Sequence, residues 1–347
     1  MGDPSEPLVV GGVAVARGER TTVRLPTAPL YTLAAMAMPV HVVRGRRDGP
    51  RLFVSAAIHG DEILGVEIIR RLLGLKLLRQ LRGTLLAVPV VNVYGYTARS
   101  RYLPDRRDLN RSFPGSPTGS MAARLAHLFM TEVVAHCTHG IDLHTGAVDR
   151  TNLPHVRVSL ERPDAVEMGR QFRVPLILHA GLRDGSLRQA VHERGVPVLL
   201  YEAGEALRLD ERAVRIGLRG VVSVMRGLGM LPRAAAAAQR GEPLVAASSR
   251  WTRAEDSGTF QLARDIGELV RAGEAVGTLT APLGDAATPV VSRDTGLLIG
   301  KTQLPLVYEG EALFHVARLA EAEAAEDRLA AYDDRLAGWH APVDDDH

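Results

Sequence analysis

The sequence predicts a layered α/β domain followed by a smaller all-β module, and three observations support this prediction. Apolar runs of strand length alternate with stretches of helical periodicity between residues 40 and 230, which favours helices packed on a mainly parallel or mixed sheet. Near residue 232 the composition changes, and MetLeuProArg is followed by five consecutive alanines. From residue 245 the chain consists of short β-prone runs separated by Gly, Asp and Pro, which is typical of strands joined by turns.

These observations set the expected division of the chain. A length of 347 residues allows two domains at roughly 100–200 residues per domain. We expect an α/β domain over residues 1–232, a β-module over residues 245–318 and a helical acidic tail over residues 319–347. No chemistry is assigned to the tail.

The expected elements of the α/β domain follow one another along the chain. Residues 1–30 are typical of short strands and turns. Two β-prone runs, Val40–Val43 and Leu52–Ala57, flank a charged turn and indicate either a hairpin or two sequential strands. Apolar residues recur at helical spacing between Glu62 and Gln80, which predicts a helix. Further along we expect a helix at Met121–Ala135 and strands at Leu85–Val93, Ile141–His144, Leu176–His179 and Val196–Tyr201.

Composition excludes several classes of protein. Hydrophobic residues make up 46% and charged residues 24% of the chain, which excludes a collagen-like, low-complexity or wholly disordered protein. The net charge of +2 provides no bulk attraction to nucleic acid or to an anionic membrane. The single cysteine, Cys137, excludes an internal disulfide and a cysteine-rich zinc site, so His and carboxylate side chains would have to hold any metal.

The sequence shows no pattern of membrane insertion or secretion. The longest apolar stretch, Leu30–Val43, is about 14 residues long, whereas a membrane-spanning helix needs about 20. Acidic residues and prolines occupy the N-terminal segment, where a signal peptide would have basic residues and an apolar core. We therefore expect a cytoplasmic protein with no nucleic-acid or membrane partner, and the oligomeric state, a homo-oligomer included, stays open.

The first candidate site residues are His59 and Glu62, in the segment AlaAlaIleHisGlyAspGluIleLeuGly at residues 56–65. His59 ends a β-prone run and Glu62 lies near the start of the next helix, where positions three apart point to one side. An imidazole and a carboxylate placed in this way could hold one metal ion. Alternatively, the two side chains cap the helix and form surface hydrogen bonds.

A third candidate is His144, at the end of the apolar strand in IleAspLeuHisThrGly at residues 141–146. Ligands of open α/β sheets bind at the carboxyl ends of strands, so His59 and His144 could reach the same crevice. Asp142 lies two residues earlier and would face the same side, where it could orient a histidine ligand. Alternatively, His144 is a buried histidine whose hydrogen bonds Asp142 satisfies.

Glu202 follows another apolar run, in TyrGluAlaGlyGlu at residues 201–205. A carboxylate at such a strand end could take a proton from a metal-activated water and deliver it to a leaving amine. Alternatively, Glu202 is an exposed acid in a turn.

Polar donors are dense in ArgArgAspLeuAsnArgSerPheProGly at residues 106–115. The segment has neither helical nor strand periodicity, so we expect a loop. Asn110 and Arg111 could hold a substrate carboxylate, with Arg111 using its planar guanidinium. Arg101, Arg106 and Arg107 are cations nearby, and any of them could instead be a solvated side chain of an Arg-rich loop.

Together and in this order, the four segments resemble the succinylglutamate desuccinylase/aspartoacylase family, which is related to the zinc carboxypeptidases. The resemblance covers most of residues 40–318. It implies a three-layer α/β/α sandwich with a mixed sheet and a lipoyl-like C-terminal module that covers the mouth of the cleft. A lipoyl-type carrier would need a Lys at a hairpin tip, and the matching region around Pro282–Pro289 has none, so we expect a structural module.

The resemblance also implies a catalytic metal site. In the family a His-Gly-x-Glu segment supplies two zinc ligands, which match His59 and Glu62. The His of an Asp-Leu-His segment supplies the third, which matches His144. The general base lies in a Glu-x-Gly segment, which matches Glu202. We therefore expect one Zn²⁺ per chain with a fourth position open for water, although these ligands do not exclude Mn, Fe or Co.

The substrate implied by the resemblance is a small N-acyl amino acid or a related amide that carries a carboxylate. The family's Asp-Leu-Asn-Arg segment binds this carboxylate and matches Asn110 and Arg111. Aspartoacylases polarise the scissile carbonyl with an Arg from an Asn-Pro-Arg turn, but the corresponding segment here is ValAsnValTyrGlyTyr, residues 91–96. Arg101, Arg106 or Arg107 could replace it, and we count Arg101 and Arg107 among the candidate substrate-binding residues. The acyl group and the amine are not implied.

Two other functions stay open. A metallocarboxypeptidase acting on a peptide or γ-glutamyl C-terminus would use the same metal and base. A non-catalytic binding protein could keep the fold but would hold no tightly bound metal. The complete set of three ligands and Glu202 argues against the second alternative.

Overall fold

The computed structural model describes residues 7–233, 242–283 and 287–319, together with residues 325 and 329. A small N-terminal sheet consists of β1 (Leu8–Val10) and β2 (Val13–Val15). The strands that follow are β3 (Arg20–Thr27), β4 (Met36–Arg44), β5 (Arg47–Ala56), β6 (Arg82–Val88), β7 (His139–Gly146), β8 (Arg150–Val158), β9 (Leu176–His179) and β10 (Val198–Glu205). The C-terminal strands are β11 (Leu244–Ala246), β12 (Ser248–Arg253), β13 (Gly258–Leu262), β14 (Leu269–Val270), β15 (Ala275–Thr280), β16 (Ala287–Val291), β17 (Gly296–Thr302), β18 (Leu306–Val307) and β19 (Ala312–Arg318).

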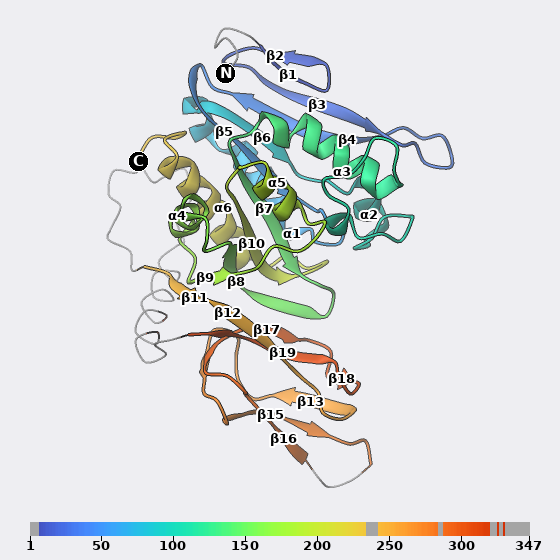
Figure 1. Cartoon of the computed structure of the whole chain (residues 1–347), viewed down its shortest axis with the longest axis vertical. Coiled ribbons are helices and arrows are strands. Elements are labelled where there is room, and N and C mark those ends of the chain that lie inside the picture. Colours follow the sequence, from blue (N-terminus) through green and yellow to red (C-terminus); the bar gives the residue numbers. More distant parts are fainter. Residues whose placement is uncertain (1–6, 234–241, 284–286, 320–324, 326–328, 330–347) are drawn as a thin grey trace.

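One large mixed sheet runs through most of the described chain (Figure 1). Its main row has the order β12-β19-β17-β8-β10-β7-β5-β6-β4-β3, and β9, β11 and β14 are attached to this row. Strands β6, β5, β7 and β10 are parallel neighbours. The carboxyl ends of β5, β7 and β10 therefore lie at one edge of the sheet, where α/β proteins bind ligands.

Helices cover both faces of the α/β part of the sheet. One hydrophobic core contains apolar residues of α1 (Leu64–Gly74), α4 (Pro163–Phe172) and α6 (Glu211–Gly227). A second core contains apolar residues of α2 (Val93–Ala98), α3 (Met121–Glu132) and α5 (Leu187–Glu193). Side chains of β5 alternate between the two cores, because successive residues of a strand point to opposite faces. This is the predicted mixed α/β architecture.

Several observed elements differ from the predicted ones, and each difference has a physical cause. The runs at residues 40–43 and 52–57 are sequential strands and not a hairpin, because β6 lies between β4 and β5 and pairs with both. The helix expected over residues 62–80 stops at Gly74, because Leu75 is extended with a ψ of 129° before a 3₁₀ turn at Lys76–Gln80. The strand expected at residues 85–93 ends at Val88, before Pro89, which cannot donate a ladder hydrogen bond.

The described residues between 244 and 318 form strands and turns and no helix. Four of the strands make a separate antiparallel sheet in the order β16-β15-β13-β18. Strand β17, in contrast, pairs with β8, so β12, β17 and β19 continue the large sheet below the α/β part (Figure 1). This pairing covers an edge of β8 that would otherwise expose unpaired backbone groups.

The expected boundaries at residues 232 and 245 stay a prediction. The alanine run at residues 234–238 lies outside the described residues, as does the expected tail except for residues 319, 325 and 329. Within the described part of the chain, no helix is long and apolar enough to cross a membrane.

Candidate metal centre and substrate pocket

His59 and Glu62 lie in a tight loop between the end of β5 and the start of α1. The backbone N–H of Glu62 donates to the carbonyl of His59 at 3.1 Å, which brings positions three apart to one side. Gly60 between them lies against the backbone of α2 (Val93–Ala98), and a Cβ there would come within 1.9 Å of the carbonyl carbon of Gly95. Only glycine fits this approach without a shift of the backbone.

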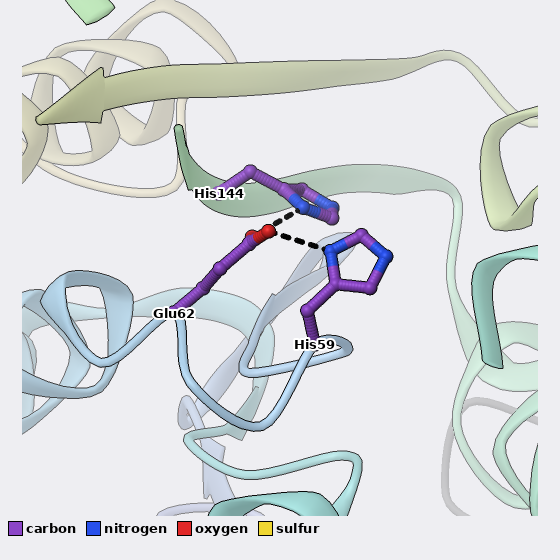
Figure 2. Close-up of side chains that lie close together, drawn as sticks. All are labelled: His59, Glu62 and His144. Atoms are coloured by element: carbon purple, nitrogen blue, oxygen red, sulfur yellow. Dashed lines mark hydrogen bonds and ion pairs between the residues drawn. The ribbon is translucent and has the colours of Figure 1, made fainter. Parts of the chain in front are cut away.

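His144 reaches the same point from β7. The Nδ1–H groups of His59 and His144 donate to the two carboxylate oxygens of Glu62 at 2.6 and 2.7 Å, and Figure 2 shows the three side chains pointing toward one another. One ligand atom from each residue lies within 4.8 Å of the others, and all three residues are buried. The structure therefore brings together the three residues predicted as metal ligands.

The Nε2 atoms of both histidines, which point away from Glu62, lie beside other carboxylates. Nε2 of His144 lies 2.7 Å from Oδ2 of Asp142, and the hydroxyl of Ser55 donates to the other oxygen of Asp142 at 2.8 Å. Nε2 of His59 lies 3.1 Å from Oδ1 of Asp108. These contacts fix the ring orientations and leave each Nδ1 facing Glu62. Sequence reasoning anticipated Asp142 but missed Asp108 and Ser55. The single polar residue of the apolar run LeuPheValSerAlaAla could have indicated that Ser55 contacts a buried polar group.

Charged neighbours shift the pKa values of all three residues of the cluster. Burial opposes charge on His59 and His144, but the carboxylates of Glu62, Asp108 and Asp142 outweigh it, and the pKa of each histidine is raised. Burial would raise the pKa of Glu62, but the two adjacent histidines hold it below its usual range. The carboxylate and the two imidazoles therefore favour one another's charged forms.

This donor set fits a divalent metal such as zinc. Two neutral imidazoles and one carboxylate are the protein ligands of many catalytic zinc sites, in which a fourth position stays open. Each histidine would bind the metal in its neutral form, because a ring nitrogen must be free of its proton to coordinate.

The predicted substrate residues lie at different distances from the cluster. Arg101 lies closest, with Nη1 3.3 Å from Glu62 and Nη2 3.1 Å from Asp108. Asn110 and Arg111 line a cavity to whose wall the His59–Glu62–His144 cluster also contributes. Arg107 is 63% exposed, ion-paired with Asp105 at 3.8 Å and absent from the cavity lining, so its predicted role gains no support from the structure.

Glu202 lies in β10, in register with His144 of the neighbouring parallel strand β7. Its side chain is 13% exposed and lines the cavity. Nδ2 of Asn152 donates to one carboxylate oxygen at 3.1 Å, and Nε of Arg157 lies 3.2 Å from the other. Both partners come from β8, which sequence reasoning did not identify as a strand.

One cavity of about 520 Å³ joins these groups. His59, Glu62, His144, Glu202 and Arg101 contribute to its lining. Strands β12 and β19 also contribute, through residues that include Trp251 and His315, whose rings stack with centroids 4.6 Å apart. The C-terminal strands thus form part of the wall.

The sequence and the fold both match known proteins. Residues 48–228 match the sequence profile of the succinylglutamate desuccinylase/aspartoacylase catalytic domain. A curated relative from Halomonas elongata, an N-alpha-acetyl-L-2,4-diaminobutyric acid deacetylase, is 26% identical over 302 residues, which cover 83% of this chain and 87% of the relative.

Two solved structures share the fold. A product-bound ectoine utilization protein from Ruegeria pomeroyi superposes with a TM-score of 0.79 at 22% identity, covering 91% of this chain and 100% of that one. A succinylglutamate desuccinylase/aspartoacylase from Rhodobacter sphaeroides superposes with a TM-score of 0.76 at 24% identity, covering 86% of this chain and 95% of that one.

Proposed function

Because this chain belongs to the succinylglutamate desuccinylase/aspartoacylase family, we propose that it is a zinc-dependent hydrolase that cleaves the amide bond of a small N-acyl amino acid. The observation that carries the proposal is the buried His59–Glu62–His144 cluster, which opens into a cavity that Glu202 also lines. The products would be a carboxylic acid and an amino acid with a free amine.

Arginine and asparagine side chains would orient the substrate. Arg111 lines the cavity, and its guanidinium would bind the substrate carboxylate through paired hydrogen bonds. The side-chain oxygen of Asn110 accepts from the backbone N–H of Leu187 at 2.9 Å, so its amide N–H groups are directed elsewhere and could bind the same carboxylate. Arg101, beside Glu62, would stabilise negative charge that develops on the scissile carbonyl oxygen.

Glu202 would move the protons of the reaction. Its carboxylate would accept a proton from the attacking water and then deliver it to the departing amine nitrogen. Asn152 and Arg157 hold its two oxygens and thereby fix its direction. When bound at His59, Glu62 and His144, zinc supplies a Lewis acid that polarises the carbonyl and makes water nucleophilic near neutral pH.

The curated relative supports a deacylase over the alternatives, because its name describes a deacetylase acting on an N-acetyl amino acid. A metallocarboxypeptidase would need the same metal and base but would act on peptides. A binding protein would have no use for a carboxylate base beside the metal ligands. The cytoplasmic location and the absence of nucleic-acid and membrane partners remain predictions.

A substrate screen tests the proposal directly. The zinc-loaded protein is incubated with N-acetyl and N-succinyl amino acids and, separately, with dipeptides and γ-glutamyl peptides, and the release of free amine is measured. We expect amine release from at least one N-acyl amino acid, and its loss in His144→Ala. Hydrolysis of peptides alone would favour the carboxypeptidase, and hydrolysis of neither class by metal-loaded protein would contradict a hydrolase.

A further inference from the structure

Gly300 lies on β17, between a residue that contacts the proposed base and a residue that lines the cavity. Its register partner on one side is Asn152 of β8, and its partner on the other side is His315 of β19. His315 lines the cavity, whereas neither Gly300 nor Asn152 is among the described residues that do. An effect of Gly300 on the reaction would therefore have to pass through one of these two neighbours.

The side chain of Asn152 lies between Gly300 and Glu202. Asn152 is 8% exposed, and its Nδ2 donates to Oε1 of Glu202 at 3.1 Å. An ionised carboxylate only accepts hydrogen bonds, so the amide has to turn its nitrogen toward Glu202. The amide oxygen is then turned toward Gly300, where a Cβ would come within 2.8 Å of Oδ1. Glycine at position 300 thus leaves the space in which the amide can point its N–H group at Glu202.

A shift of register brings Asn152 within reach of Glu202. Between β8 and β10, His155 is the partner of Glu202, and Asn152 is the partner of Gly204. Strand β8 therefore has one residue more than β10 between these pairs, as in a β-bulge. The extra segment contains Pro154, which has no N–H to donate to the ladder. Bulges bend a strand and re-aim its side chains, which explains why Asn152 contacts Glu202 and not only its own register partner.

The amide of Asn152 is the group that would yield to a side chain at position 300. Its near atom is the end of a rotatable side chain, and turning that side chain costs less than moving a strand that is paired on both sides. The next nearest atoms to the added Cβ are Cβ of His315 at 3.3 Å and the backbone oxygen of Thr151 at 3.5 Å. These contacts need little or no adjustment. A turned amide would withdraw its N–H group from Glu202.

We propose that Gly300 is a positioning residue for Glu202 and acts through the side chain of Asn152. The C-terminal strands then do more than form part of the cavity wall, because β17 provides the space that keeps the base directed. The inference rests on the proposed function for the role of Glu202 as the base. A displacement of about 1 Å in a reacting group can cost about 10²-fold in rate. Substrate binding should change little, because neither Gly300 nor Asn152 lines the cavity.

Steady-state kinetics of the zinc-loaded protein measure this effect. Gly300→Ala should lower kcat on a hydrolysed N-acyl amino acid by about 10–100-fold, with KM within threefold of wild type and with zinc content and the urea midpoint unchanged. Gly74→Ala is the matched control and should leave kcat unchanged, because a Cβ there meets no atom within 4 Å. A kcat of Gly300→Ala within threefold of wild type would overturn the inference. A large fall in its urea midpoint would also do so, because the strand and not the amide would then have yielded.

A double-mutant cycle separates action through Asn152 from action through His315. Asn152→Ala removes the donor to Glu202, so we expect kcat to fall and KM to stay within threefold of wild type. In a chain that already carries Asn152→Ala, Gly300→Ala should lower kcat by less than a further threefold, because its route to the base is gone. An equal loss in both backgrounds would overturn the inference and assign the effect to His315, whose Cβ lies close to the added methyl group.

The side-chain amide signal of Asn152 reports its contact with Glu202 without any turnover. In nitrogen-15-labelled, zinc-loaded protein, nuclear magnetic resonance identifies this signal by its loss in Asn152→Ala. We expect the signal to move in Glu202→Gln, which removes the charge of the acceptor, and in Gly300→Ala, but not in Gly74→Ala. A signal that does not move in Gly300→Ala would overturn the inference.

The two readouts distinguish the inference from the proposed function. A signal that moves in Gly300→Ala, in a protein that hydrolyses no N-acyl amino acid, would overturn the proposed function and leave the contact between Gly300, Asn152 and Glu202 intact. Hydrolysis whose kcat does not respond to Gly300→Ala would do the reverse.

Discussion

Glu202 and His144 are register partners on the neighbouring parallel strands β10 and β7. This pairing sets a carboxylate beside the metal-ligand cluster without any contribution from a flexible loop. Parallel strands place register partners on the same face of the sheet. The separation of Glu202 from His144 is therefore set by the hydrogen-bond ladder between β10 and β7.

The first prediction concerns the proton transfer assigned to Glu202. Glu202→Gln keeps the shape of the side chain and its contact with Arg157 but cannot accept a proton. We expect kcat to fall by about 10²–10⁴-fold, the usual contribution of a general base, with metal content unchanged. Glu205→Gln, on the same strand but outside the cavity lining, is the control. Activity of Glu202→Gln within tenfold of wild type would contradict the role.

The second prediction concerns Asp142, whose carboxylate contacts Nε2 of His144. Asp142→Asn weakens the hydrogen bond to Nε2 of His144 and removes the charge that orients the ring. We expect zinc affinity to fall by about 10–100-fold, as is usual for such outer partners. Competition with a chromophoric chelator measures the affinity, and Asp256→Asn on the exposed surface is the control. An unchanged affinity would mean that Asp142 does not position this ligand.

The third prediction concerns the close approach at Gly60. Gly60→Ala places a Cβ against the backbone of Gly95, and neither backbone segment can yield without moving the His59–Glu62 loop. We expect a loss of about 1–3 kcal/mol or more in the free energy of unfolding, measured with urea, together with weaker zinc binding. Gly74→Ala, where a Cβ meets no atom within 4 Å, should cost nothing. Equal stability of the two variants would show that the loop has room.

The fourth prediction concerns pH and the buried imidazole of His155, which faces Glu202 across the ladder. Burial and the nearby Arg157 lower the pKa of His155 to about 3. Between the ordinary histidine pKa near 6.5 and about 3, the unfolded chain binds a proton that the folded chain does not, so stability falls as pH falls.

Unfolding free energies measured between pH 6.5 and pH 4 check this assignment. The decline should be shallower in His155→Gln than in wild type by up to about 1.4 kcal/mol per pH unit. Parallel slopes would mean that His155 titrates normally in the folded protein.

The three residues of the candidate metal cluster lie in short-range sequence patterns. His59 and Glu62 lie three residues apart at a helix start, and His144 ends an apolar strand two residues after Asp142. The parallel order of β5, β7 and β10 then brings the strand ends together. Spacing alone left a capping or hydrogen-bonding role open for each residue, and the resemblance of the combined segments to the family singled out these three as a ligand set.

Other parts of the site depend on pairings that local sequence does not encode. Asn152 and Arg157 contact Glu202 only because β8 lies antiparallel beside β10, and residues 150–158 carry no clear strand pattern. Trp251 and His315 reach the cavity because β12 and β19 continue the large sheet through β17. The order of β4, β6 and β5 likewise follows from long-range packing and not from the turn between β4 and β5.

Metal content tests the central claim most directly. Wild type and His144→Ala are purified side by side, and elemental analysis measures the zinc in each before and after equilibration with added zinc. We predict about one zinc per chain in wild type and a large loss in His144→Ala, because two remaining ligands bind far more weakly than three. No metal in wild type, and none taken up from solution, would contradict the account.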